Sequence, residues 1–99
     1  MPAPIAIIDF ETTGSTPAQG ARATEVAVVL VEGGRVVDQF QSLMNAGVRI
    51  PPFITQLTGI TNAMVADAPP AAEVMAQARR FVGDTPLVAN NAPYNRGIW

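Results

Sequence analysis

Near its N-terminus the chain carries a short apolar run, residues 5–8, that leads directly into the two carboxylates of Asp9 and Glu11. An apolar run of this length is typical of a strand that is buried on both faces of a sheet. Side chains alternate along a strand with a period of two, so a strand that continues to Glu11 puts Asp9 and Glu11 on the same side. Gly14 can then turn the chain away. We therefore expect two carboxylates at the carboxyl end of a central strand, where open α/β sheets bind their ligands.

Two neighbouring carboxylates repel each other and raise each other's pKa unless a positive charge lies between them. A divalent cation neutralises such a pair, and oxygen ligands suit Mg²⁺ or Mn²⁺. The alternative is that both acids are simply solvated at the end of the strand. The spacing alone leaves both interpretations open.

The next two strands are predicted from their composition and from the turn between them. Residues 24–31 are apolar on both faces, which indicates a strand in the interior of a covered sheet. Gly33 and Gly34 follow, and a glycine pair supplies the two positive φ angles of a type I′ hairpin turn. Residues 36–43 mix apolar and polar side chains, which fits an edge strand. These two strands should therefore pair antiparallel.

Helices dominate the prediction for the following part of the chain. We expect a short helical turn over residues 53–58, closed by Gly59, and a second over residues 62–65, capped by Thr61. The main helix should open at residues 67–70, with proline in its first turn, and should end at Gly83. Its core-facing stripe follows the helical period and comprises Ala71, Val74, Met75, Ala78, Phe81 and Val82.

The chain then returns to the sheet. Residues 86–89 form a strand that, after a helical crossover, should lie parallel beside the first strand. A turn over residues 90–93 and the start of a further helix at Tyr94 complete the prediction. The fold class is α/β, with a mixed sheet in the order 3-2-1-4 and helices packed on it.

Composition excludes several classes of function. With 99 residues, 48% of them hydrophobic, the chain suffices for one small domain with a core. It has six arginines, no lysine and eight acids, and this net charge of −2 is not that of a protein that grips nucleic acid along its length. It has no cysteine for disulfides or thiolate zinc sites, and no histidine for a Ser-His-Asp triad. We see no membrane span and no signal peptide, and we expect a cytoplasmic protein.

Three stretches together resemble a known family. Residues 9–14, Asp-Phe-Glu-Thr-Thr-Gly, resemble the first motif of the DEDD-type 3'-5' exonucleases, the family of the proofreading epsilon subunit of bacterial DNA polymerase III. Residues 54–61, Ile-Thr-Gln-Leu-Thr-Gly-Ile-Thr, resemble the segment after the third strand of that family. Residues 87–95, Leu-Val-Ala-Asn-Asn-Ala-Pro-Tyr-Asn, resemble its second motif. The resemblance covers nearly the whole chain, which spans about the first half of the family's domain.

The resemblance implies the N-terminal half of a ribonuclease H-like fold and a two-metal site. In the family, four acids hold two metal ions, and a histidine or tyrosine in the third motif activates water. Asp9 and Glu11 match the first two acids, which makes them the expected metal ligands and catalytic residues. Thr12, Thr13 and Gly14 match the segment that holds the terminal nucleotide of the substrate.

The chain departs from the family at the later motifs. The third acid falls at Asn95, which offers a carbonyl oxygen but no charge, and Asn90 stands where family members often have histidine. The fourth acid and the general base would lie beyond Trp99. We therefore expect residues 1–99 to be an incomplete exonuclease domain that lacks the third motif, holds at most one Mg²⁺ or Mn²⁺, and is inactive on its own.

The expected function is that of the family, metal-dependent release of nucleoside monophosphates from the 3' end of DNA or RNA, as in DNA replication. A DNA polymerase is a possible partner. Missing helices would leave one face of the sheet open, so we also expect a homo-oligomer or a partner chain that covers it. Two alternatives stay open. One is a non-catalytic interaction module derived from the exonuclease fold, and the other is an unrelated phosphoesterase with the same paired acids.

Overall fold

The computed structural model describes residues 3–13 and 22–89. Over these residues the chain runs β1 (Ile5–Thr12), β2 (Ala23–Glu32), β3 (Arg35–Leu43), α1 (Pro52–Thr58), α2 (Asn62–Ala66), α3 (Ala71–Val82) and β4 (Leu87–Ala89). The strands form one sheet in the order β3-β2-β1-β4. β2 pairs antiparallel with both β1 and β3, and β4 pairs parallel with β1. The predicted strands, their order and their directions are all confirmed.

The hairpin between β2 and β3 is the turn that the sequence predicts. Glu32 and Arg35 are the last paired residues, so the loop consists of Gly33 and Gly34 alone. Their φ angles are 60° and 77°. Both angles lie in the left-handed region that a type I′ turn requires and that glycine adopts without steric cost. The pair therefore sets the antiparallel pairing next to the turn, and the register shifts once farther along, between Leu30 and Val31.

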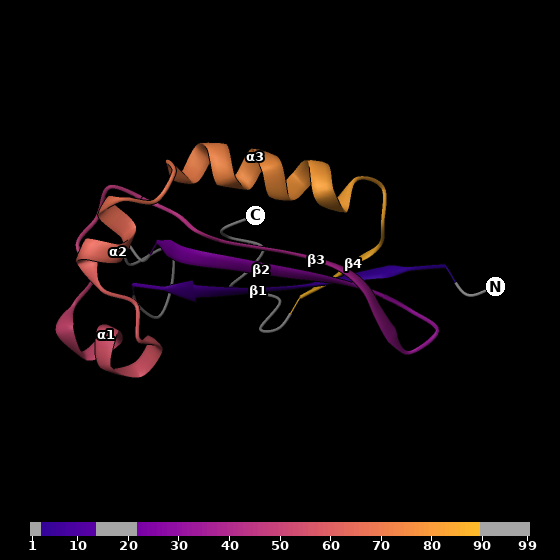
Figure 1. Cartoon of the computed structure of the whole chain (residues 1–99), viewed down its shortest axis with the longest axis horizontal. Coiled ribbons are helices and arrows are strands. Elements are labelled where there is room, and N and C mark those ends of the chain that lie inside the picture. The colour runs from indigo at the N-terminus through magenta and orange to yellow at the C-terminus, as the bar shows by residue number, and fades with distance from the viewer. Residues whose placement is uncertain (1–2, 14–21, 90–99) are drawn as a thin grey trace.

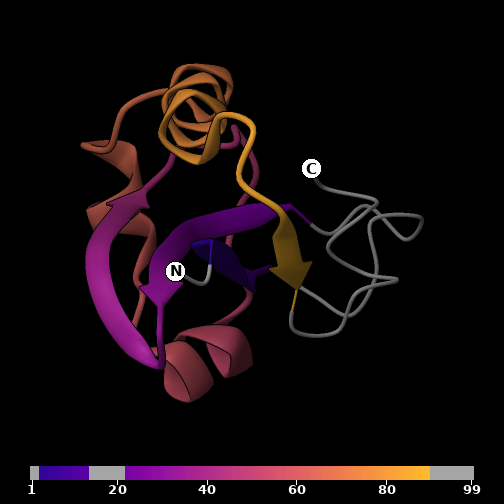
Figure 2. The same ribbon diagram turned by 90° about the vertical axis from the view of Figure 1, so that its right-hand side faces the viewer.

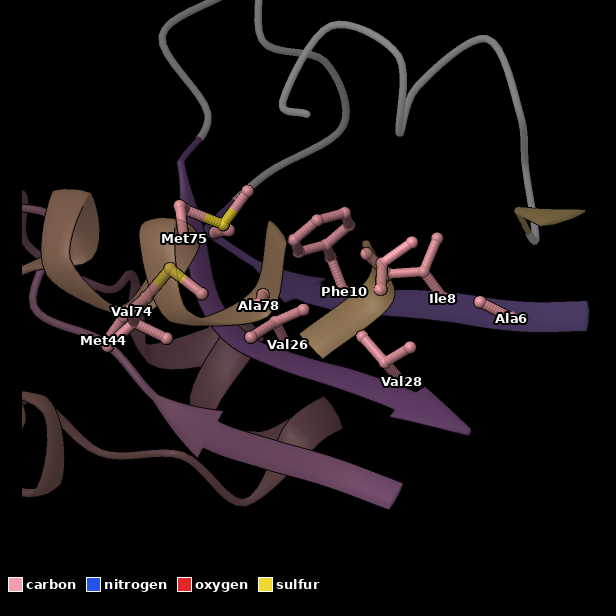
Figure 3. Close-up of a cluster of buried hydrophobic side chains, with 11 residues drawn as sticks. Ala6, Ile8, Phe10, Val26, Val28, Met44, Val74, Met75 and Ala78 are labelled. Atoms are coloured by element: carbon pink, nitrogen blue, oxygen red, sulfur yellow. The ribbon is translucent and has the colours of Figure 1, made fainter. Parts of the chain in front are cut away.

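The main core lies between the sheet and α3, which runs across one face of it (Figures 1 and 2). β1 contributes Ala6, Ile8 and Phe10, the even positions of the strand, and all three are buried. Figure 3 shows these side chains facing the helix together with Val26 and Val28 of β2. The helix contributes the predicted stripe, of which Val74, Met75, Ala78 and Val82 are buried and Ala71 and Phe81 pack at its margin. Each fully buried valine, isoleucine or methionine side chain of this core contributes roughly 1.5–3 kcal/mol of transfer free energy.

A second, smaller cluster joins α1 and α2 to the end of β3. Gly59 ends α1 in the left-handed conformation, with φ 79°, and the Thr61 hydroxyl accepts a hydrogen bond from Met64 N at the start of α2. Both predicted helix boundaries are thus confirmed. Leu43, at the end of β3, packs against the apolar cluster that these helices bury, namely Ile50, Ile54, Ile60 and Val65.

One predicted helix boundary is wrong. The structure places Pro69 and Pro70 before α3 rather than in its first turn, and Pro70 occupies the N-cap position with ψ 143°. Proline disfavours helical backbone in the residue that precedes it, so Pro70 disfavours a helical Pro69. The segment instead follows the chain after β3, where Asn45 O accepts a hydrogen bond from Ala71 N at 2.9 Å. The predicted turn at residues 90–93 and the helix from Tyr94 lie outside the described residues.

Candidate active site

The two carboxylates that the sequence singles out lie on one side of β1, facing away from α3. Burial alternates along the strand, with the even positions in the core and the odd positions, including Asp9 and Glu11, on the opposite face. Asp9 is exposed, and Glu11 is partly buried. The register places them opposite Ala27 and Glu25 of β2. The prediction that the two acids share a side is therefore confirmed, and they lie toward the carboxyl end of a strand with neighbours on both sides.

Glu25 is a third acid on this face, and the sequence analysis gave it no role. It lies directly opposite Glu11, and its Oε2 accepts a hydrogen bond from Gln41 Nε2 at 3.2 Å. Partial burial raises the pKa of Glu11, and the nearby charges of Asp9 and Glu25 raise it further. The signal for Glu25 lies in the cross-strand register, which brings together residues that are fourteen positions apart in the sequence.

The carboxyl end of β1 is fastened to the start of β2. Thr13 N donates to Arg22 O, and Arg22 N donates back to Thr13 Oγ1, both at 2.9 Å. Thr24 Oγ1 donates to Glu11 O at 3.1 Å, next to an irregularity in the register between Glu11 and Thr12. Thr13 is buried, so its side chain holds the two strands together beside the carboxylates. This arrangement fixes the backbone from which Glu11 projects.

Asp9 is also oriented by its own backbone. Its Oδ1 accepts a hydrogen bond from Phe10 N at 3.0 Å. Phe10 is held in the core between β1 and α3, so the peptide that donates this bond is fixed (Figure 3). One carboxylate oxygen of Asp9 is thereby oriented toward the backbone of β1.

Thr12 is the last residue of β1. The predicted site residues Gly14 and Asn95 lie outside the described residues, as does Asn90. Within residues 3–13 and 22–89, no group of three or more histidine, cysteine, aspartate or glutamate side chains is arranged to hold a metal ion. The site that the structure describes is therefore a pair of carboxylates, Asp9 and Glu11, with Glu25 beside it.

α1 and α2 flank this face of the sheet. Leu43, which packs against their cluster, pairs with Glu25, so Glu11, Glu25 and Leu43 form one row across three strands. Figures 1 and 2 show α1 on the side of the sheet opposite α3, near the end of β1. Phe53 and Leu57 of α1 are 65% and 80% exposed, although both are large and apolar. An exposed apolar surface therefore lies on the same side of the sheet as the carboxylates.

Comparison with known proteins agrees with this geometry. The family model described as exonuclease (RNase_T) matches residues 6–95. The chain is 35% identical over 92 residues to the 3'-5' exonuclease DinG of Bacillus subtilis (strain 168), covering 93% of this chain and 10% of that protein. It is 42% identical over 91 residues to the DNA polymerase III subunit epsilon-like protein of Rhodobacter capsulatus, covering 90% of this chain and 13% of that protein.

A solved structure shares the fold. Exonuclease X in complex with 5' overhanging duplex DNA matches with a TM-score of 0.79 and 32% sequence identity, over 95% of this chain and 52% of that chain. This likeness confirms the expected ribonuclease H-like arrangement of the sheet. The chain thus spans about half of exonuclease X and a small part of the curated relatives it matches. Because the family model covers nearly its whole length, the chain belongs to the exonuclease family.

Proposed function

We propose that this chain is part of a metal-dependent 3'-5' exonuclease domain that hydrolyses phosphodiester bonds at a nucleic acid end. The observation that carries the proposal is the placement of Asp9 and Glu11 on one side of β1, at its carboxyl end, on the face that α3 leaves free. The relatives support the direction of hydrolysis, because DinG of Bacillus subtilis is a 3'-5' exonuclease. A nucleic acid end is the proposed partner, and the likeness to an epsilon-like protein supports a DNA polymerase as a second one.

The chemistry of the two side chains fits Mg²⁺ or Mn²⁺. Both offer carboxylate oxygens, which are the ligands these hard cations prefer. The repulsion that contributes to the raised pKa of Glu11 is the repulsion that a bound cation removes. Two carboxylates are too few to enclose a pair of cations, and Asn95 at the third acidic position adds no charge. We therefore propose at most one cation, held by Asp9 and Glu11.

Asp9 and Glu11 would hold the divalent cation, which would supply charge stabilisation for the phosphodiester and Lewis acidity toward water. The protein's own part is to position and to bind. Asp9 and Glu11 present their oxygens from a stretch of β1 that is paired with β2 and hydrogen-bonded to Thr24, so little reorganisation is needed. Thr12, Thr13 and Gly14 are proposed to hold the terminal nucleotide. Thr13 N already donates to Arg22 O, and Thr13 Oγ1 accepts from Arg22 N. The hydroxyl hydrogen of Thr13 is therefore the donor that Thr13 can offer to a nucleotide.

Exposed Phe53 and Leu57 extend the proposed site along α1. Bases of a single strand stack on exposed aromatic side chains such as Phe53 with little regard to sequence, and an aliphatic side chain such as Leu57 offers apolar contact beside them. Neither contact needs a net positive charge. That suits a chain with a net charge of −2. The substrate, DNA or RNA, would thus be held by its end and by one or two bases rather than along its length. The cytoplasm, where such substrates occur, is the proposed compartment.

We further propose that residues 1–99 form an incomplete exonuclease domain and are inactive alone, because only Asp9 and Glu11 of the described acids match those of the family and Asn95 stands in place of a third. The same two facts favour a second candidate function, a non-catalytic interaction module that keeps the exonuclease fold. The presence of a carboxylate pair at a strand end, with Asp9 exposed and Glu11 partly buried, favours the first candidate, since a scaffold has no physical need for it.

Cation binding tests the proposal directly. Titration with Mn²⁺, followed by the loss of its free electron paramagnetic resonance signal, should show binding by the wild-type chain. Asp9→Asn keeps the shape of the side chain and removes its charge, so it should weaken binding at least tenfold. The matched control is Asp38→Asn, which removes an exposed acid from β3 on the α3 side of the sheet.

Absence of Mn²⁺ binding by a folded wild-type chain would reject the metal-dependent function and leave the interaction module. Binding that Asp9→Asn and Asp38→Asn weaken equally would show a diffuse charge effect rather than a site. Hydrolysis of an oligonucleotide labelled at its 5' end, assayed on the same preparations, reports whether residues 1–99 retain any activity.

A further inference from the structure

β1 and β2 place two like charges directly opposite each other. Glu11 and Glu25 are register partners, whereas the neighbouring pairs on the same face are Asp9 with Ala27 and Ile7 with Val29. Like charges in directly opposite positions of a sheet destabilise it. An apolar or small residue at position 25 would continue the pattern of β2 and remove this cost. The stability of the fold therefore does not explain why Glu25 lies opposite Glu11.

Gln41 holds Glu25 on the side away from β1. Its Nε2 donates to Glu25 Oε2 at 3.2 Å, across the β2–β3 pairing. Gln41 is the register partner of Ala27, so the bond runs diagonally along the face that carries the carboxylates. Next to it, Leu43 pairs with Glu25 and packs against the α1–α2 cluster. Glu25 is thus constrained from the β3 side, and Glu11 meets a fixed negative charge on its β2 side.

We propose that Glu25 is a positioning residue of the carboxylate site, held by Gln41 so that its charge biases the Glu11 side chain toward Asp9 and raises the affinity of the pair for a divalent cation. This inference rests on the proposed function. Glu25 is proposed to act through Glu11 and not as a ligand, because its carboxylate is hydrogen-bonded by Gln41 on the β3 side. Like-charge repulsion falls with distance, so of the two acids of β2 it is Glu25, directly opposite Glu11, that acts on it more strongly.

This role predicts effects of opposite sign on stability and on binding. Glu25→Gln removes the repulsion, so the metal-free chain should become more stable in urea unfolding. The same change removes the negative charge that favours the cation, so Mn²⁺ affinity should fall by about three- to tenfold. A residue with a merely structural role would lower both quantities together. Glu25→Asp keeps the charge and should retain most of the affinity.

Two further variants sharpen the experiment. Gln41→Leu removes the amide that holds Glu25 but keeps the size of the side chain, and it should weaken Mn²⁺ binding less than Glu25→Gln does. Glu32→Gln removes the same charge from the same strand, seven residues away, which is roughly 23 Å at the rise of a β-strand. It should leave Mn²⁺ affinity within twofold of the wild-type value. Unfolding is measured in EDTA and binding by Mn²⁺ titration.

The possible results distinguish the positioning role of Glu25 from the proposed metal-dependent function. A wild-type chain that binds no Mn²⁺ overturns both. A wild-type chain that binds Mn²⁺, with Glu25→Gln binding equally well, overturns the positioning role alone. Loss of both stability and affinity in Glu25→Gln also overturns it, since that result marks a structural residue. Higher stability with lower affinity, and no effect of Glu32→Gln, supports it.

Discussion

Glu11 is the residue whose environment most disfavours its charged form. Partial burial, then the charge of Asp9 and then that of Glu25 raise its pKa, so the folded chain holds this proton more tightly than the unfolded chain does. Between the ordinary glutamate pKa and the raised one, the native state therefore binds more protons than the unfolded state. In that window the Glu11 contribution to stability falls as pH rises, and above it the charged carboxylate stays unfavourable.

The Glu11→Gln variant should consequently be more stable than the wild type at neutral pH in metal-free buffer. The difference should shrink as pH falls toward the ordinary glutamate range, where the wild-type side chain is also neutral. Urea unfolding of both proteins in EDTA at several pH values measures it, because the other carboxylates titrate in both proteins and cancel in the difference. Parallel stability profiles would contradict this account of Glu11.

The sequence predicts some residues of the candidate site but not others. That Asp9 and Glu11 share a side follows from the period of a strand, which needs no knowledge of neighbouring strands. The role of Glu25 depends on the register between β1 and β2, and the sequence of neither strand alone predicts that register. Likewise, the hydrogen bonds of Thr13 with Arg22 join residues that are nine positions apart in the sequence, and no local pattern predicts this contact.

At the scale of single elements, local signals predict most of the fold. The glycine pair at 33–34 predicts the hairpin, and the apolar stripe of α3 predicts which helix face packs on the sheet. The start of α3 is the exception. A proline pair is compatible with a first helical turn and with the extended segment before it, and the contact of Ala71 with Asn45 selects the second. That contact joins distant parts of the chain, so no local sequence pattern predicts it.

α1 carries the element-scale prediction for substrate binding. Phe53 and Leu57 are largely exposed and lie four residues apart, so both project from one side of the helix. Replacing both with serine should weaken binding of a short single-stranded oligonucleotide by about 1–3 kcal/mol for each stacked base that is lost. Exposed positions contribute little to folding, so thermal stability should change little.

Fluorescence anisotropy with a dye-labelled oligonucleotide, in the presence of Mn²⁺, measures this loss. The double change Val48→Ser and Met64→Ser serves as the control, because both side chains are exposed and apolar but lie outside α1. Equal weakening by the two double variants would mean that general surface hydrophobicity, and not α1, retains the oligonucleotide. Unchanged binding in the α1 variant would remove α1 from the proposed site.

At the scale of the whole molecule, residues 3–13 and 22–89 cover the two faces of the sheet unequally. α3 covers the face that carries the main core, whereas the opposite face carries apolar side chains of three strands beside the carboxylates. Ile5 and Val88 on that face are 37% and 50% exposed. Their register partners there are Val31 and Ile7, which makes the apolar surface continuous across β2, β1 and β4. Continuous exposed apolar surface of this kind favours association.

The chain should therefore self-associate through this face as its concentration rises, with light scattering as the measurement. The double variant Ile5→Thr and Val88→Thr keeps β-branched side chains in both strands while making the face more polar, so it should shift the chain toward monomer. Val48→Thr makes a matched change at a residue that is 40% exposed outside the strands, and it should leave association unchanged. A wild-type chain that stays monomeric at every concentration would show that this face is not an association surface. The carboxylate pair lies on the same face, so we also expect association and Mn²⁺ binding to affect each other. Light scattering repeated with saturating Mn²⁺ shows whether cation binding lowers or raises the association.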